Sequence, residues 1–533
     1  MRYCDCFRKQ IDKALLTPIR ALKPRYIPLL LIYFSYGLAG FSAIALSFWE
    51  KENLSLSAEQ LISISVWIMV PWTLKMVFGQ MVDSVKLFGN QRKSYIFLGA
   101  FLMILGTILL AGLAGRHDWI MWIGNEYMIY LLSAVFMTFG FVIQDVTADT
   151  MTTEVVDRTE IKKGKKVSRS DQSVQSELSM VQLLGRLALS LAAFSVAGFG
   201  GWLAQHVAYE TIFWMTLGIP LISCVGVLFI RLEKVQDHER KPLNKHILFW
   251  GLVFAVFSVV MAMSNLPFAQ EIVFGVSLVL LAAMMCLVTK DLPKAKFRVL
   301  ALTLLVLFLY RLTPYTGPGL QWWMIDSLGF NQMFFGILAQ LGALVALLVL
   351  WLFSDFIANK PIRSVLIFLV FADTIMSLPE LGLYFGIHET LGMSAQAVAM
   401  FDTALGSPLA NISMVPLLAL LAFYAPAGYR GTWFAIGASL MNLALSGGRI
   451  LTKYLNQAFE VTREILDEAG TILVPEDYTE LGTLMIVRLI IGFALPLFAI
   501  LLFLRKTPRV APEQIQGDLS EQAPIPPQKK VDE

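Results

Sequence analysis

Residues 94–115 read SYIFLGAFLMILGTILLAGLAG, an unbroken run of 22 residues without a charged side chain. About 20 consecutive apolar residues are needed for a helix to cross the hydrocarbon core of a bilayer. Charged residues stand directly before and after the run, at Lys93 and Arg116. This stretch predicts a transmembrane helix, and it indicates the class of the whole chain.

Similar apolar runs lie on both sides of this one. They cover residues 27–49, 61–82, 127–149, 178–203, 211–230, 247–263, 270–289, 299–323, 331–353, 364–385, 399–424, 431–455 and 483–504. The 533 residues are 57% hydrophobic and 15% charged, with a mean hydropathy of +0.66, which excludes a water-soluble domain. We expect an all-α polytopic membrane protein with about fourteen transmembrane helices in the order six, two, six.

This order predicts five regions. They are a cytoplasmic segment 1–26, an N-terminal six-helix bundle 27–230, a cytoplasmic loop with an extra helix pair 231–298, a C-terminal six-helix bundle 299–504 and a disordered cytoplasmic tail 505–533. The extra pair is almost wholly apolar, so we expect it to pack at the periphery and to line no transport path. The first ten residues, MRYCDCFRKQ, lack a cleavable signal, so we expect the first helix to be retained.

The loop charges predict the orientation of the chain in the membrane. With the N-terminus inside, loop 231–246 holds five Lys and Arg residues and loop 290–298 holds four. The outside loops contain only Lys51, Arg116 and Arg463 as basic residues. Because short cytoplasmic loops are enriched in Lys and Arg, both termini are expected to be cytoplasmic, with the protein in the cell (inner or plasma) membrane.

A glycine and charge motif occupies the turn just before residues 94–115. It consists of Gly79, Asp83, Gly89, Arg92 and Lys93. We expect Gly79 to let two helices approach closely, and Asp83 to cap a helix or to form a salt bridge across the turn. A weaker copy, Ser354-Asp355 and Lys360-Pro361-Ile362-Arg363, follows the tenth predicted helix.

The motif resembles the signature loop of the major facilitator superfamily, and its repetition suits a transporter built from two related halves. The resemblance implies a major facilitator fold with two six-helix bundles, here with two extra helices. It also implies that the acid and the basic pair form a latch that opens and closes during transport. Here three residues more than usual separate Asp83 from Gly89.

A narrower resemblance, to the folate-biopterin transporter family, rests on residues from three regions. These are Val70-Pro71-Trp72-Thr73-Leu74-Lys75 with Asp83-Ser84 and Tyr95; Thr313-Pro314, Leu328-Gly329-Phe330 and Gly336; and Ala425-Pro426-Ala427-Gly428, Thr432 and Phe434-Ala435. Met76 stands where that family usually has Pro. The resemblance implies a secondary active transporter of a folate- or pterin-like solute. The alternative is a muropeptide-type permease or another transporter of anionic metabolites, because Gln144-Asp145 with Asp149 is similar to a run in muropeptide permeases.

Charged residues inside the predicted helices are the candidate pathway for substrate and protons. They are Lys75, Asp145, Asp149, Arg186, Arg311, Asp373 and Asp402, together with Glu177 and Arg449. An ionisable group at the centre of a helix costs about 2.5–3.5 kcal/mol on insertion scales, so it needs a partner or a watery cavity. Asp145 and Asp149 are four residues apart and share a helix face, where such a pair can carry a proton. Either carboxylate could instead only neutralise Lys75 or Arg186, and Asp149 and Glu177, nearer the cytoplasmic ends, favour a structural role.

Aromatic residues near these charges could stack on a flat heterocycle. The candidates are Tyr33, Tyr36, Tyr310, Tyr315, Trp322 and Trp323. A pterin ring offers a pair of donors to a carboxylate and a face to an aromatic ring, whereas a glutamyl tail requires Arg or Lys.

Other classes of protein are disfavoured. The five histidines form no His-Glu-x-x-His motif and no phosphate-binding loop precedes a Lys-Ser/Thr pair, so neither a membrane-embedded transferase nor an ATPase is expected. Scattered single charges do not suit the symmetric filter of a channel. We expect a small-molecule substrate, protons and the lipid bilayer as partners, no nucleic acid, no cofactor, no metal, four free cysteines and a monomer.

The extra helix pair gives a topological prediction. A tag at Asn265 should be reachable from outside the cell and a tag at Lys294 only from inside, because two spans must return the chain to the cytoplasm. Labelling intact and permeabilised cells with an antibody measures this. Both tags on one face would mean a re-entrant hairpin and twelve spans.

Overall fold

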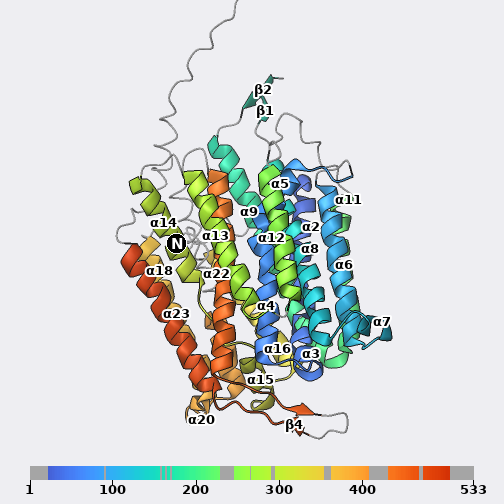
Figure 1. Cartoon of the computed structure of the whole chain (residues 1–533), viewed down its shortest axis with the longest axis vertical. Coiled ribbons are helices and arrows are strands. Elements are labelled where there is room, and N and C mark those ends of the chain that lie inside the picture. The colour runs from blue at the N-terminus through green and yellow to red at the C-terminus, as the bar shows by residue number, and fades with distance from the viewer. Residues whose placement is uncertain are drawn as a thin grey trace, which may run out of the picture.

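The computed structural model describes most of the chain. The described residues are 22–88, 92–156, 159–162, 165–168, 171–228, 245–264, 266–289, 294–352, 362–406, 430–466 and 472–504. The long helices run side by side along one axis (Figure 1). We call the end that holds β1 and β2 in Figure 1 the upper end, and the end that holds α7, α15, α20 and β4 the lower end.

Residues 24–228, which we call the first bundle, form a group of packed helices. Its elements are η1 Pro24–Tyr26, α2 Ile27–Leu38, η2 Ala39–Ser42, α3 Ala43–Asn53, α4 Ala58–Thr73, α5 Lys75–Ser84, α6 Lys93–Ala114, α7 Asp118–Met121, α8 Glu126–Glu154, α9 Asp171–His206, α10 Tyr209–Met215 and α11 Gly218–Leu228. Helix α8 packs against α6 and α4, and α2 packs against α9 and α11.

The rest of the helices form the extra pair and the second bundle. The pair is α12 Lys245–Met263 and α13 Ala269–Thr289; the second bundle contains α14 Lys294–Arg311, α15 Gly319–Asp326, α16 Gln332–Leu352, α18 Ile362–Met376, α19 Leu378–Tyr384, α20 Ile387–Thr390, α22 Arg430–Ala458 and α23 Leu481–Phe503. Two small antiparallel hairpins, β1 Thr159–Lys162 with β2 Lys165–Ser168 and β3 Ile465–Leu466 with β4 Ile472–Val474, lie at opposite ends of the molecule (Figure 1).

The predicted spans agree with these helices in most places. Among the described residues, eight helical segments are long and apolar enough to cross a membrane, and three shorter apolar helices accompany them. Most of the predicted helix 399–424 lies outside the described residues, although residues 395–406 are helical. The polytopic helical fold is therefore confirmed, and the count of fourteen stays a prediction.

Two of the helices predicted after residue 298 are interrupted in the described part of the chain, each beside proline. The helix expected over 299–323 ends at Arg311, and residues 312–318 are not helical before α15 begins. Pro314 and Pro318 cannot donate a helical hydrogen bond, and Gly317 has a φ of +96°. Side chains of α22 form hydrogen bonds with the backbone of this non-helical segment. The Tyr315 N–H donates to Thr452 Oγ1 at 3.0 Å, and Asn456 Nδ2 donates to the Thr316 carbonyl at 3.0 Å. The helix expected over 364–385 is divided in the same way before Pro379.

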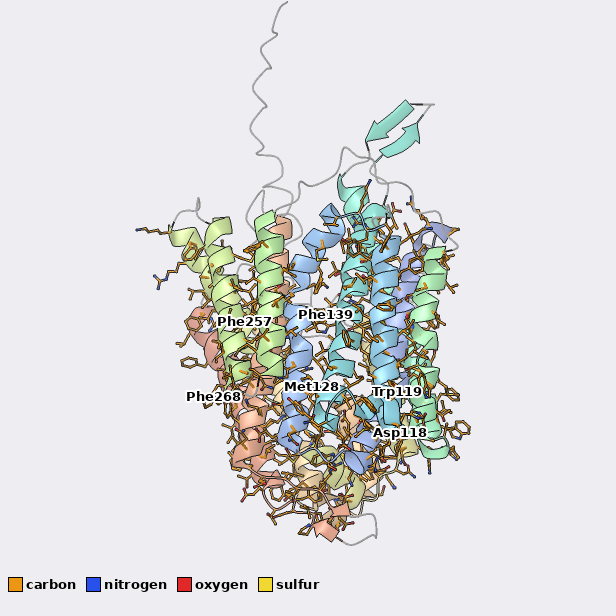
Figure 2. All side chains as sticks on the ribbon, turned by 45° about the vertical axis from the view of Figure 1, so that its right-hand side comes forward. Asp118, Trp119, Met128, Phe139, Phe257 and Phe268 are labelled. Atoms are coloured by element: carbon orange, nitrogen blue, oxygen red, sulfur yellow. The ribbon has the colours of Figure 1, made fainter. Side chains whose placement is uncertain are left out.

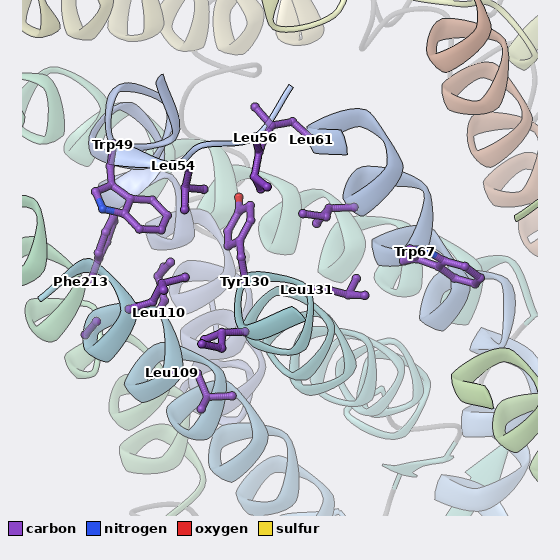
Figure 3. Close-up of a cluster of buried hydrophobic side chains, with 14 of the residues drawn as sticks. Trp49, Leu54, Leu56, Leu61, Trp67, Leu109, Leu110, Tyr130, Leu131 and Phe213 are labelled. Atoms are coloured by element: carbon purple, nitrogen blue, oxygen red, sulfur yellow. The ribbon is translucent and has the colours of Figure 1, made fainter. Parts of the chain in front are cut away.

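A large apolar cluster packs the lower part of the first bundle. Trp49 of α3 meets Phe213 of α10 and Tyr130 of α8 edge to face, with ring centroids 5.7 and 5.9 Å apart (Figure 3). All three side chains are at most 6% exposed. This cluster joins α3, α8 and α10 into one rigid unit.

The two bundles meet along α4 with α22 and along α9 with α16. At the crossing of α9 with α16, two glycines face each other. A Cβ added to Gly201 would stand 2.6 Å from the Cα of Gly336, and one added to Gly336 would stand 2.9 Å from the Cα of Gly201. Only glycine allows backbones this close, and both residues lie near the lower ends of their helices.

This crossing predicts the effect of adding a side chain. Gly336→Leu should destabilise the protein by about 1–3 kcal/mol through overpacking against Gly201, and Gly336→Ala should have a smaller effect. Thermal unfolding of the purified protein measures it. Gly492→Leu on α23, where an added Cβ would have nothing within 4 Å, is the control and should leave the unfolding temperature unchanged. Equal stability of both Leu variants would contradict a tight crossing.

Candidate functional site

An ion cluster joins α5 and α8 inside the first bundle. Lys75 Nζ lies 2.6 Å from Asp145 Oδ2 and 2.7 Å from Asp149 Oδ2. The Tyr33 hydroxyl donates to Asp149 Oδ1 at 2.9 Å. One ammonium therefore lies between two carboxylates, which confirms that the two acids share a helix face. We call Lys75, Asp145 and Asp149 the charged triad.

Pro71 places Lys75 at this position. Proline has no N–H, and the helix breaks three residues later, at Leu74, between α4 and α5. The Val70 carbonyl accepts both the Leu74 N–H at 3.3 Å and the Thr73 hydroxyl at 2.7 Å. Lys75 is consequently the first residue of α5, which turns its side chain toward α8. The second predicted helix, 61–82, is therefore two helices.

Aromatic rings lie close to the triad. The Tyr36 ring meets Trp72 and Phe141 edge to face, with centroids 6.4 and 5.4 Å away. Tyr33 lies directly against Gly185 of α9, where a Cβ would be 2.7 Å from the ring. Of the predicted stacking residues, Tyr33 and Tyr36 are thus the two beside the charged triad.

Arg186 and Glu177 of α9 have different surroundings. Arg186 is exposed and forms none of the ion pairs among the described residues, although its charge acts on Asp145. Glu177 accepts from Lys23 Nζ and Arg25 Nη2, both at 2.6 Å, and from the Tyr26 hydroxyl. The hydrogen bond with Glu177 raises the pKa of Lys23, which precedes the first helix. Glu177 therefore fastens the start of the first helix to α9.

Arg311 ends α14 in the second bundle. Its Nε is buried and has no hydrogen-bond partner among the described residues, and none of the ion pairs found there includes Arg311. Tyr310 is next to it, and the charge of Asp373 on α18 acts on Tyr310. An arginine in this state can bind an anion without first giving up another partner.

Tyr315 and Arg449 reach across to the first bundle. Arg449 Nη1 donates to the Ser65 carbonyl at 2.5 Å, and the Tyr315 hydroxyl lies 3.5 Å from Ser65 Oγ. Asn442 Nδ2, farther along α22, donates to the Trp72 carbonyl at 3.3 Å. These contacts join α4 to the second bundle between the lower end and the middle of the helices.

Asp402 belongs to a separate group. The charge of Glu380 acts on Asp402, and Arg488 Nη1 lies 3.9 Å from Glu380 Oε2. Sequence reasoning missed Glu380 and Arg488, although both fall within predicted apolar runs, 364–385 and 483–504. A charged residue inside a predicted apolar helix was the signal that selected Asp373 and Asp402, and the same signal could have found Glu380 and Arg488.

Polar contacts close the lower end between the bundles. Lys51 Nζ of α3 lies 2.5 Å from Asp326 Oδ1 of α15, and the Tyr478 hydroxyl donates to Asp326 Oδ2. Arg463 Nη1 donates to the Glu50 carbonyl at 2.6 Å, and Nη2 donates to the Leu54 carbonyl. We call Lys51, Asp326, Tyr478 and Arg463 the lower-end layer. Lys51 and Arg463 were expected in outside loops, yet the Lys51 side chain is 11% exposed and Arg463 is 4% exposed.

Trp322 packs against the lower-end layer. The Arg463 guanidinium lies 5.1 Å from the Trp322 ring centroid, a cation–π distance, and Trp322 is 3% exposed. A cavity of about 480 Å³ opens beside it, between residues 55–60 and the end of α22. Trp322 lines this cavity, whereas the triad, Arg311 and Asp402 do not.

Three residues of the predicted latch, Gly79, Arg92 and Lys93, can be placed in the structure. Arg92 is 7% exposed, and its Nη1 donates to the Val82 carbonyl at 2.5 Å, where a cation suits the C-terminal end of α5. Lys93 begins α6. Gly89 and the side chain of Asp83 lie outside the described residues. The close approach expected at Gly79 is wrong, because an added Cβ would be 3.9 Å from Val146 Cγ1, an ordinary contact.

Comparison with solved structures gives the class of protein. The fold is similar to a transporter of the POT family in complex with a thioalcohol-conjugated peptide (TM-score 0.62, 11% identity, 91% of this chain and 98% of that chain). It is also similar to the inward-open xylose transporter XylE of E. coli (TM-score 0.53, 14% identity, 92% and 98%). The chain therefore has the fold of the major facilitator transporters.

Sequence comparison gives the family. The sequence model of the BT1 family matches residues 36–517, and the chain belongs to this family. It is 24% identical to the folate-biopterin transporter of Synechocystis sp. over 465 residues, which cover 86% of this chain and 79% of the relative. It is 21% identical to folate transporter 1 of Plasmodium falciparum over 433 residues, 81% of this chain and 72% of the relative. The protein is a multi-pass membrane transporter and not an enzyme.

Proposed function

We propose that the chain carries a folate- or pterin-like solute by alternating access, driven by symport with protons. In this proposal it acts as a monomer in the cell (inner or plasma) membrane, with both termini cytoplasmic. The names of its relatives support the solute class. The concentration of Lys and Arg in the loops of one side supports the orientation.

The charge distribution of the two bundles supports a solute with two unlike ends. With both acids ionised, the charged triad of the first bundle has a net charge of −1 and can accept hydrogen bonds from a pterin ring. Tyr33 and Tyr36 beside the triad offer aromatic faces for that ring. In the second bundle, the buried Nε of Arg311 has no partner among the described residues, and this observation carries the proposal. Its guanidinium would bind the carboxylates of a glutamyl tail.

The lower-end layer supports alternating access. The polar contacts between the bundles among the described residues lie between the lower end and the middle of α4 and α22. One end is thus held shut by contacts that can be exchanged for water. We infer that this is one of two states, and that the other requires α4 to separate from α22 and α9 from α16 at the lower end.

Arg311→Gln tests the solute and its orientation. In proteoliposomes we expect the KM for folate to rise about tenfold or more, because a charge-assisted hydrogen bond is worth about 1.5–3 kcal/mol. The KM for biopterin, which lacks the glutamyl tail, should change little. Arg298→Gln, at the exposed start of the same helix, is the matched control and should leave both values unchanged. An equal rise for both solutes would give Arg311 a structural role. Uptake of muropeptides, but of neither pterin, by the unchanged protein would refute the solute class.

Asp145→Asn tests proton coupling. Within the triad, the Asp145 side chain is 17% exposed and that of Asp149 is 51% exposed, so Asp145 is the deeper acid. Asparagine mimics a permanently protonated acid, so the variant should lose uphill accumulation and keep exchange of solute between two loaded sides. Asp149→Asn is the matched control and should still accumulate. Normal pH-dependent accumulation by Asp145→Asn would move the coupling role to Asp373 or Asp402.

A further inference from the structure

The extra helices α12 and α13 lie against both bundles. Helix α12 packs on α5 of the first bundle, whereas α13 packs on α22 of the second bundle and also touches α4. Figure 2 shows Phe257 on α12 and Phe268 at the lower turn that joins the pair. The pair lies at the periphery, as the apolar sequence predicts, because side chains such as Val256 of α12 and Val279 of α13 are exposed. Its inner face covers the line where α4 meets α22.

Glycines make two of these contacts tight. A Cβ on Gly251 of α12 would stand 2.4 Å from Val77 Cγ1 of α5. A Cβ on Gly447 of α22 would stand 3.0 Å from the ring of Phe274 on α13. The buried side chain of Phe254 on α12 joins the apolar cluster of the first bundle, and that of Leu281 on α13 joins the cluster of the second. Helix α12 thus packs on the first bundle, whereas α13 packs mainly on the second bundle and also contributes Ala269 and Val273 to the cluster of the first.

Gln270 contacts both bundles with one amide group. Its Nε2 donates to the Ser63 carbonyl at 3.0 Å and lies 2.7 Å from Ser63 Oγ, both on α4. Its Oε1 accepts from Lys453 Nζ of α22 at 3.3 Å. Gln270 is 6% exposed and Lys453 is 8% exposed. In this closed state the amide therefore bonds to half-buried Ser63 on one side of the interface and to buried Lys453 on the other.

Glu271, the next residue, holds α13 to α22 by charge. Lys453 Nζ lies 2.5 Å from Glu271 Oε1, and the Tyr454 hydroxyl donates to the same oxygen at 2.7 Å. Lys453 also lies 4.8 Å from the centroid of the Tyr454 ring. These charge-assisted contacts are stronger than the amide contact to Ser63, so α13 should stay with α22 when the bundles move.

We propose that α12 and α13 form a clasp that favours closure of the lower end, with Gln270 and Glu271 as its positioning residues. The proposal rests on the alternating access proposed above. Ser63 lies near the start of α4 and Lys453 near the end of α22, so both belong to the part that must separate. As α22 separates from α4, the Glu271–Lys453 ion pair keeps Gln270 beside Lys453. Gln270 then loses its hydrogen bonds to Ser63. The loss of this buried contact opposes opening.

Distances between spin labels at the lower end test the clasp. The full-length protein, with its four cysteines replaced by serine, takes labels at Asp118→Cys on α7 and Glu389→Cys on α20, both exposed. Electron–electron double resonance in proteoliposomes then gives the populations of short and long distances. Gln270→Ala and Glu271→Gln should each raise the ratio of long to short distances about fivefold or more. Ser277→Ala, which removes only a bond to Val273 within α13, is the control and should have no effect.

A charge exchange separates the clasp from a general loss of packing. Glu271→Lys should open the lower end, and adding Lys453→Glu should restore the short distance because the ion pair is re-formed with reversed polarity. Unchanged distances in both Gln270→Ala and Glu271→Gln would overturn the proposal. The measurement needs no solute, so it is independent of whether folate or another molecule is carried.

Discussion

The salt bridges of Lys75 are the interaction on which the first bundle depends. A charge that leaves water for the membrane interior must find a partner, and a single ammonium between Asp145 and Asp149 meets that requirement for three side chains at once. The helix break after Pro71 helps to meet this requirement, because it places Lys75 at the start of a new helix that faces α8. A feature that weakens α4 as a helix therefore builds the charged site.

The two bundles differ in how their charges in the membrane interior find partners. In the first, the charges are bonded to each other and an added proton would neutralise the triad. In the second, Arg311 keeps a buried donor without a partner among the described residues, and Asp402 lies near Glu380 and Arg488 in a separate group. A binding site needs some polar groups that have no partner within the protein, because the solute can then form hydrogen bonds that folding has not already formed. This asymmetry makes Arg311 the stronger candidate for recognition and the triad the stronger candidate for coupling.

Hydropathy and loop charge were enough to predict the helical membrane fold, because lipid requires long apolar helices whatever their packing. The spacing of Asp145 and Asp149 likewise predicted a shared face, and α8 confirms it. The sequence could not show that Lys51, in the last turn of α3, and Arg463, in the loop after α22, are buried. Each becomes enclosed only when segments about 270 to 410 residues apart meet. The role of α12 and α13 was missed for a related reason: Gln270 and Glu271 begin an otherwise apolar run, and their partners Ser63 and Lys453 belong to different bundles.

The chemistry of the lower-end layer suits a contact that must be made and broken repeatedly. Lys51 and Asp326 are near the ends of helices and Arg463 is in the loop after α22. Water can replace each lost partner there as soon as the bundles part, so opening leaves few charges unsolvated. A charged pair at the middle of the membrane would not have this freedom, and the triad there stays within one bundle. Gln270 is the exception, because its amide is buried at the interface itself and bonds to both bundles. The energy that opposes opening should therefore be concentrated at the α4–α22 line and its clasp, more than in the salt bridges that close the end.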